Sequence, residues 1–180
     1  FTQLDGRKST NFCVALSDQM HSSGMSKCPQ PTTPLPTLPQ SFILVPIQIP
    51  RDYTIHHHSP IKVKYFIDSL QEWAGATQNH IVFKLHPFNK SDTDIINSVS
   101  EAITSPYVHS VDGNIHELIK QSKGLFVINS GTGFEALIHG RPVCTFGSCD
   151  YSSVSYNSDI RKLDDARNFI YNYKEKMREV

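Results

Sequence analysis

The 180-residue chain lacks any long apolar run, since no stretch approaches the ~18 to 20 apolar residues that a membrane-spanning helix needs. It also lacks an excess of charge, because seventeen basic residues balance seventeen acidic ones. Nothing in this composition favours binding nucleic acid or an anionic membrane through a broad charged face. We therefore expect no nucleic-acid partner and no transmembrane segment, and any anion must be bound at a local site.

Paired metal-binding cysteines are missing as well. The chain has four cysteines, Cys13, Cys28, Cys144 and Cys149. None forms the C-x-x-C pattern of a zinc site, so we interpret them as reduced, mainly structural thiols. His56-His57-His58 is a weak metal candidate, because adjacent residues on an extended loop point in different directions. We expect no metal and no required cofactor. Without a signal-peptide pattern the location is expected to be cytoplasmic, although the chain opens on Phe1 and an upstream portion could be missing.

Residues 1–40 differ in composition from the rest of the chain. They are rich in Ser, Thr, Pro and Gln, and five prolines fall between positions 29 and 39. Such a run is typical of a loosely ordered linker with polyproline character, and recruitment of a partner domain is the alternative. Residues 41–180 leave about 140 residues of regular pattern, the usual size of one domain.

Short apolar runs alternate with amphipathic segments after residue 41. The expected strands are 42–47, 80–85, 107–108, 125–128 and 142–146, and the expected helices are 59–75, 91–103, 114–121, 131–139 and 163–177. Ser59 and Pro60 suit the N-cap and first turn of the first helix. The alternation predicts an α/β fold with a doubly wound parallel sheet, Rossmann-like. Ligands bind such sheets at the carboxyl ends of the strands, where strand order reverses.

The segment Asn129–Leu137 combines a strand exit, a turn of small residues and a helix start. The first backbone N–H groups of such a helix point outward with the positive end of the helix dipole, which suits a phosphate. Ser130 and Thr132 add hydroxyl groups, and Gly131 and Gly133 let a ligand approach the main chain. The alternative is an ordinary strand-to-helix turn capped by Ser130. The segment matches neither the P-loop pattern nor the dinucleotide-binding pattern.

Polar residues also follow the neighbouring strands. Gln48 follows the first strand, and Pro87 holds His86 in an extended conformation at the end of the second. His86 is a candidate donor to a phosphate and a stabiliser of an anionic leaving group, and the alternative is a histidine packed at a strand end. Lys84 lies two residues before His86 and faces the same side, either toward a phosphate or toward solvent. Glu135 is a candidate to accept hydrogen bonds from sugar hydroxyls, and the alternative is a carboxylate that caps its helix.

These motifs, in this order and spacing, are similar to those of a known family. The segments are Val45–Gln48, Asp52, Ile55, His58–Pro60, Phe83–Pro87, Asn129–Leu137, His139–Val143, Phe146-Gly147 and Tyr151. They resemble the capsule polysaccharide biosynthesis and export family, which includes bacterial transferases of 3-deoxy-manno-octulosonic acid (Kdo). The resemblance spans about residues 42 to 151.

The resemblance implies a GT-B glycosyltransferase, with this chain as its C-terminal, nucleotide-sugar-binding half. His86-Pro87 and Ser130 would hold the phosphate of CMP, Gly131–Gly133 would form its cradle, and Glu135 would contact the ribose. The reaction would transfer Kdo from CMP-Kdo to a glycolipid or glycan, in the cytoplasm or peripherally at the inner membrane near the capsule export machinery. The acidic residue acting on the sugar would belong to an N-terminal half, which residues 1–40 are too irregular to form.

Two other functions remain open at this point. The first is another GT-B nucleotide-sugar enzyme, such as a UDP-sugar transferase or epimerase or a CDP-glycerol polymerase. Those enzymes share the small-residue turn but match Gln48, His58–Pro60 and His86-Pro87 less well. The second is a module that binds nucleotide without catalysis in polysaccharide export.

Overall fold

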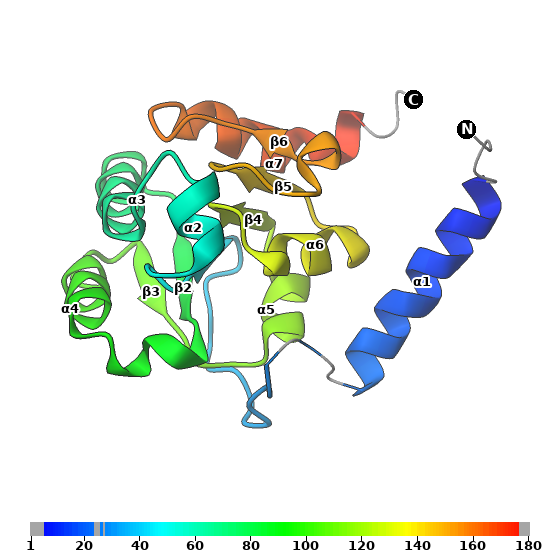
Figure 1. Ribbon diagram of the computed structural model, residues 1–180, viewed down its shortest axis with the longest axis horizontal. Helices are drawn as coiled ribbons and strands as arrows, with labels where there is room; N and C mark the ends of the chain where they lie inside the picture. The colour runs from blue at the N-terminus through cyan, green and yellow to red at the C-terminus, as the bar shows by residue number, and fades with distance from the viewer. Residues whose placement is uncertain (1–5, 24–25, 27, 177–180) are drawn as a thin grey trace.

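The computed structural model describes residues 6–23, 26 and 28–176 of the chain. Its centre is a parallel six-stranded sheet in the order β3-β2-β1-β4-β5-β6 (Figure 1). The strands are β1 (Ile43–Ile47), β2 (Ile81–Leu85), β3 (Val108–Ser110), β4 (Gly124–Val127), β5 (Val143–Thr145) and β6 (Tyr156–Asn157). This order confirms the doubly wound, Rossmann-like prediction and places the reversal of strand order between β1 and β4. Only β6, two residues long, was not expected.

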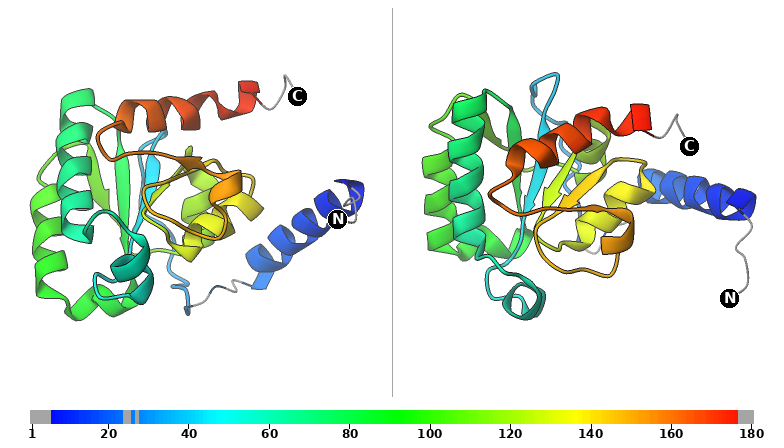
Figure 2. Two further views of the ribbon diagram at one scale, coloured as in Figure 1. Left: turned by 45° about the horizontal axis from the view of Figure 1, so that its top comes forward. Right: turned by 90° about the horizontal axis from the view of Figure 1, so that it is seen from above.

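Helices cover both faces of the sheet (Figures 1 and 2). They are α1 (Gly6–Ser23), α2 (Tyr53–His58), α3 (Val63–Thr77), α4 (Thr93–Ala102), α5 (Ile115–Gln121), α6 (Gly131–Ile138) and α7 (Leu163–Lys176), with the short 3₁₀ helices η1 (Pro87–Ser91) and η2 (Ser152–Val154). One core cluster joins α3, α4 and α7 to the sheet, and the other joins α5 and α6. The strands are apolar throughout because both faces are buried.

The start of the first predicted helix was wrong. Ser59 ends α2, its hydroxyl accepts a hydrogen bond from the Ile61 backbone N–H at 3.1 Å, and α3 begins only at Val63. The extended backbone that Pro60 imposes on Ser59 therefore separates two helices. At its other end α3 runs past Gly75 to Thr77, and Gln78 stops it in a left-handed conformation.

The prediction of irregular structure in residues 1–40 was also wrong for part of that segment. Residues 6–23 form α1, which packs against α6 and extends away from the rest of the chain (Figures 1 and 2). Ser17 of α1 lies 2.9 Å from Nδ1 of His139, just beyond α6. All prolines of this segment lie at position 29 or later, so no proline interrupts α1. Residues 28–42 contain no helix or strand. Among the described residues, no helix is long and apolar enough to cross a membrane.

Candidate functional site

A cavity of about 350 Å³ lies at the carboxyl ends of β1, β2 and β4, where the strand order reverses. We call it the switch-point cavity. Nine of the ten predicted site residues line it: Gln48, Lys84, His86, Pro87, Asn129, Ser130, Gly131, Thr132 and Glu135. Their convergence follows from the parallel sheet, which brings the ends of its strands to one edge.

Gln48 and Asn129 pair across the reversal point. The Gln48 side chain donates to Asn129 Oδ1 at 2.9 Å and accepts from the Asn129 backbone N–H at 3.1 Å. Asn129 Nδ2 in turn donates to the Thr54 carbonyl at 2.9 Å. These bonds tie the end of β1 to the end of β4 and hold α2 beside both. The two amides therefore position the wall of the cavity.

The start of α6 also lines the cavity. Ser130 is its N-cap, the role that the alternative interpretation of this turn gave it, and its hydroxyl accepts from the Thr132 backbone N–H at 3.2 Å. A Cβ built on Gly131 would meet no atom within 4 Å, so the space beside Gly131 is open to a ligand.

The predicted role of Gly133 in this cradle was wrong. Gly133 is buried and does not line the cavity, and a Cβ there would lie 2.4 Å from the Tyr151 hydroxyl oxygen. That hydroxyl donates to the Ser130 carbonyl. Burial raises the pKa of Tyr151, so the phenol keeps the proton that it donates. The packing of Tyr151 therefore explains why residue 133 is a glycine.

His86 is held in a fixed orientation at the end of β2. It is the N-cap of η1, and its Nδ1 accepts from the Phe88 backbone N–H at 3.2 Å. An Nδ1 that accepts assigns the proton of the neutral ring to Nε2, which lies 3.8 Å from Cys28 Sγ. The ring thus presents a donor on the side of the cavity that Cys28 lines.

Lys84 brings a buried positive charge to the same wall. Its side chain is only 8% exposed, and Nζ lies 3.6 Å from Asp112 Oδ1. Lys84 and His86 face the same side of β2, as their spacing predicts, and both line the cavity. The alternative prediction, a Lys84 side chain exposed to solvent, was wrong, because this side chain is buried and paired with Asp112.

Glu135 lies in the second turn of α6 and does not cap the helix. Its Oε1 accepts from the Ser26 hydroxyl at 3.1 Å, while Oε2 is buried without a hydrogen-bond partner among the described residues. Burial raises the pKa of Glu135, and the Ser26 hydrogen bond and the nearby His116 oppose that rise. An unsatisfied buried carboxylate oxygen beside a cavity can accept a ligand hydroxyl.

Sequence reasoning missed several lining residues. Asp52 and Thr54 come from the loop after β1 and the start of α2, and Ser26, Cys28 and Gln30 come from the segment expected to be a linker. Asp52 was noted only as part of the family resemblance. Its position four residues after Gln48, beyond a strand end, was the signal that could have identified it. Nothing in residues 26–30 marks them locally as part of a site.

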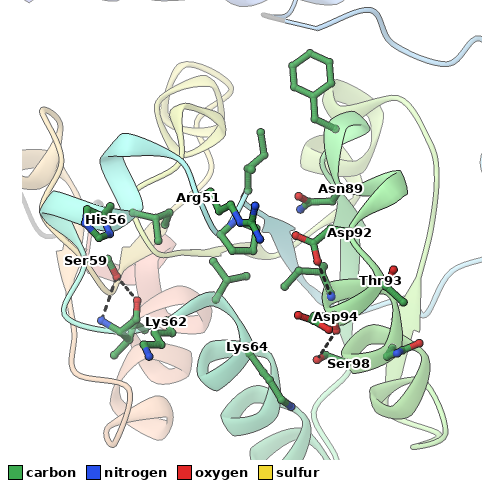
Figure 3. Close-up of a pocket in the computed structure, with 18 of the residues that line it drawn as sticks. Arg51, His56, Ser59, Lys62, Lys64, Asn89, Asp92, Thr93, Asp94 and Ser98 are labelled. Carbon is green, nitrogen blue, oxygen red and sulfur yellow. Dashed lines mark hydrogen bonds between the residues drawn. The ribbon is translucent and has the colours of Figure 1, made fainter.

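A larger cavity of about 1030 Å³ adjoins the first, between α2 and the start of α3 on one side and η1 and α4 on the other (Figure 3). Arg51 lies between the two walls and faces Asn89 and Asp92 in Figure 3. Asn89 is fully buried, and its Nδ2 donates to the Gln48 carbonyl at 3.0 Å. Its Oδ1 has no partner among the described residues. Ile49 lines both cavities.

The three consecutive histidines lie in α2, although an extended loop was expected. His56 lines the larger cavity, and the His56 and His57 rings are in edge contact with centroids 4.9 Å apart. Over residues 6–23, 26 and 28–176, no three His, Cys, Asp or Glu side chains are grouped to share a metal ion.

The family model described as "Capsule polysaccharide biosynthesis protein" matches residues 17–168. The chain belongs to this family. Among curated relatives, Protein FixF of Sinorhizobium fredii is 34% identical over 141 residues, which are 74% of this chain and 34% of the relative. Capsule polysaccharide export protein KpsS of Escherichia coli is 24% identical over 139 residues, or 70% of this chain and 35% of the relative. The chain thus spans about a third of the length of these two relatives.

Solved structures share the fold. The KpsC beta Kdo 2,7 transferase of Thermosulfurimonas dismutans matches with a TM-score of 0.58 and 24% identity, over 83% of this chain and 44% of that one. UDP-GlcNAc 2-epimerase of Methanocaldococcus jannaschii matches with a TM-score of 0.57 and 14% identity, over 76% of this chain and 40% of that one. This member of the capsule family therefore has the Rossmann-like fold found in a glycosyltransferase and in an epimerase.

Proposed function

We propose that this chain is the nucleotide-sugar-binding part of a glycosyltransferase that uses a CMP-activated sugar, CMP-Kdo, and transfers the sugar to a glycolipid or glycan. The observation that carries the proposal is the convergence of His86, Lys84 and the start of α6 in one cavity at the switch point. Cationic and N–H donors around one cavity suit a phosphate. The family supports a role in capsule polysaccharide synthesis.

The donors of the cavity stabilise the departing CMP. The sugar is bonded to a phosphate oxygen, and that oxygen gains negative charge as the bond breaks. His86 Nε2 and the N–H groups at the start of α6 are hydrogen-bond donors for this charge, and Lys84 adds a positive charge nearby. The proposal requires no metal, because the hydrogen-bond donors of this cavity stabilise the charge of one phosphate.

The resemblance implied an acidic residue from an N-terminal half, whereas we assign the acceptor to Asp52, a carboxylate of this domain. One of its oxygens is held by the Thr54 backbone N–H at 2.9 Å and the Thr54 hydroxyl at 2.8 Å, which fixes its orientation on the cavity wall. In the proposed step the acceptor hydroxyl gives its proton to Asp52, its oxygen bonds to the anomeric carbon, and CMP leaves with the bonding electrons. The acceptor would approach from the larger cavity beside Arg51.

Calorimetric titration of the chain with CMP, CDP, UDP and ADP tests the proposal. We expect preferential binding of CMP, weakened about tenfold in His86→Ala and in Ser130→Ala, because each removes a polar contact to the phosphate or to its cradle. His57→Ala is the matched control, since His57 is exposed and lines neither cavity. Binding without preference for CMP would rule out the Kdo donor.

A UDP-sugar enzyme is the second candidate, because the fold is shared with a UDP-GlcNAc 2-epimerase. Tighter binding of UDP than of CMP in the same titration would favour it. A third possibility is a module that binds nucleotide without catalysis. Transfer to a Kdo-containing acceptor by the full-length protein, lost in Asp52→Asn, would separate the enzyme from such a module. For the enzyme we propose a cytoplasmic location, peripheral to the inner membrane, where the capsule export machinery is the expected partner.

A further inference from the structure

Cys28 and Gln30 line the switch-point cavity, and the residues that follow them, up to residue 38, are held by packing. Leu35 and Leu38 pack against the core cluster beneath α5. Leu35 fits so closely over Gly113 that a Cβ on that glycine would lie 2.1 Å from Leu35 Cδ2. Cys28 and Gln30 line the cavity itself. The packing of Leu35 and Leu38 anchors the segment, and its first residues form one wall of the cavity of about 350 Å³.

The Gln30 carboxamide is locked in one orientation. Its Oε1 accepts from the Ile115 backbone N–H at 2.9 Å, and its Nε2 donates to the Cys28 carbonyl at 2.9 Å. A flipped amide would place oxygen against oxygen and N–H against N–H, so the amide cannot turn over. A carboxamide has two lone pairs and two N–H groups, which leaves one of each for a ligand.

We propose that Gln30 determines base specificity by reading the edge of the nucleotide base, an inference that rests on the proposed function. In this proposal the phosphate lies at His86 and the start of α6, and the base lies in the same cavity, on the wall that Cys28 and Gln30 line. Cytosine has an amino donor beside a ring-nitrogen acceptor, which complements the remaining lone pair of Oε1 and the remaining N–H of Nε2. Uracil in the same pose sets an acceptor against Oε1 and a donor against Nε2.

Base reading makes a prediction that a structural role for Gln30 does not. In Gln30→Leu, we expect binding of CMP to weaken about tenfold and its preference over UMP to shrink, because a paired hydrogen-bonding edge is lost. Binding of ribose 5-phosphate, which has no base, should stay unchanged. Ligand-observed NMR measures all three affinities on the full chain. Gln121→Leu, an exposed glutamine of α5 outside the cavity, is the control.

The position of the wall is tested by the reactivity of Cys28. In the full chain carrying Cys13→Ser and Cys149→Ser, Cys28 is the reactive thiol, because Cys144 is buried and its pKa is raised by that burial. We expect CMP to slow alkylation of Cys28 by iodoacetamide severalfold. Faster or unchanged alkylation would show that the segment leaves or does not touch the nucleotide, and would overturn the inference.

The two proposals fail in different ways. If the parent chain binds CMP with preference but Gln30→Leu keeps the full preference over UMP, the role of Gln30 is wrong and the proposed function stands. If Gln30→Leu weakens the binding of CMP and of ribose 5-phosphate to the same extent, Gln30 only supports the wall and does not read the base. If the parent binds none of these ligands, both proposals are wrong.

Discussion

At the residue scale, the surroundings of Glu135 are unusual for a carboxyl group in the second turn of a helix. It is half-buried, one of its oxygens has no hydrogen-bond partner among the described residues, and burial raises its pKa. A phosphate bound at the start of α6 would raise that pKa further, because like charges disfavour ionisation. Burial and a bound phosphate thus act on this pKa in the same direction, against the Ser26 hydrogen bond and His116.

The raised pKa predicts how stability depends on pH. The folded chain holds the Glu135 proton more tightly than the unfolded chain, so this stabilising contribution is complete at low pH and is lost as pH rises through the folded-state pKa. Glu135→Gln keeps the acceptor for Ser26 and removes the titration. We expect the variant to gain free energy of unfolding relative to the parent as pH rises above about 4, the ordinary pKa of a glutamate, measured by urea denaturation. The exposed Glu117→Gln is the control, and parallel profiles for parent and Glu135→Gln would contradict the prediction.

At the element scale, two glycines in the first turn of α6 differ in what requires them. Neither adopts a positive φ, so the backbone permits alanine at both positions. Gly133 has no room for a Cβ because Tyr151 lies against it, whereas the space beside Gly131 is open. Packing thus explains why residue 133 is a glycine. Neither backbone conformation nor packing explains why residue 131 is one. Close approach of a ligand would account for it.

Paired alanine variants separate these causes. Gly133→Ala should lower the free energy of unfolding by about 1 to 3 kcal/mol, because the new methyl group forces Tyr151 away. Gly131→Ala should leave stability unchanged or raise it by up to ~1 kcal/mol, as alanine favours the helix, yet weaken CMP binding. Thermal denaturation and calorimetric titration measure the two effects. Loss of stability in Gly131→Ala, or unchanged CMP affinity, would contradict this account of the turn.

Elements set by local chemistry were predictable from sequence. Asn114 and Ser130 cap α5 and α6 through bonds to backbone N–H groups two residues later, and such caps are visible in the sequence. Ser59 also looked like a cap, but Pro60 and the bonds between Ser59 and Ile61 turn the chain between two helices. The same residue types thus serve at either end of a helix, and local pattern does not decide between them.

Contacts between distant residues account for what the sequence did not predict. Tyr151 leaves room only for a glycine at position 133. The segment around Cys28 and Gln30 has the composition of a linker, yet it contacts His86 and Ile115. The sheet order brought nine predicted residues to one edge, because that follows from topology. Gly133, the tenth predicted residue, does not line the cavity because Tyr151 packs against it, and no local pattern reports that contact.

At the scale of the whole molecule, the sheet consists of two halves that meet between β1 and β4. Their register pairs only Ile43 with Gly124 and Leu44 with Leu125, while β1 continues to Ile47. Beyond that short pairing, the amides of Gln48 and Asn129 bridge the two strands. The cavity lies at this end of the two strands, where the strand order reverses.

A double-mutant cycle on this bridge tests how far it couples the two halves. Gln48→Ala and Asn129→Ala should each lower the free energy of unfolding by about 1 to 3 kcal/mol, since each removes hydrogen bonds between the half-buried Gln48 and the buried Asn129. The double variant should cost less than the two effects added together, with a coupling of about 0.5 to 3 kcal/mol. Urea denaturation of the four proteins gives this energy. As a control, the effects of Gln71→Ala and Asn129→Ala on the free energy of unfolding should be additive, because Gln71 shares no hydrogen-bond partner with Asn129. Additivity between Gln48 and Asn129 would mean that hydrophobic packing of β1 on β4 alone joins the halves, and that the amides are available to contact a nucleotide directly.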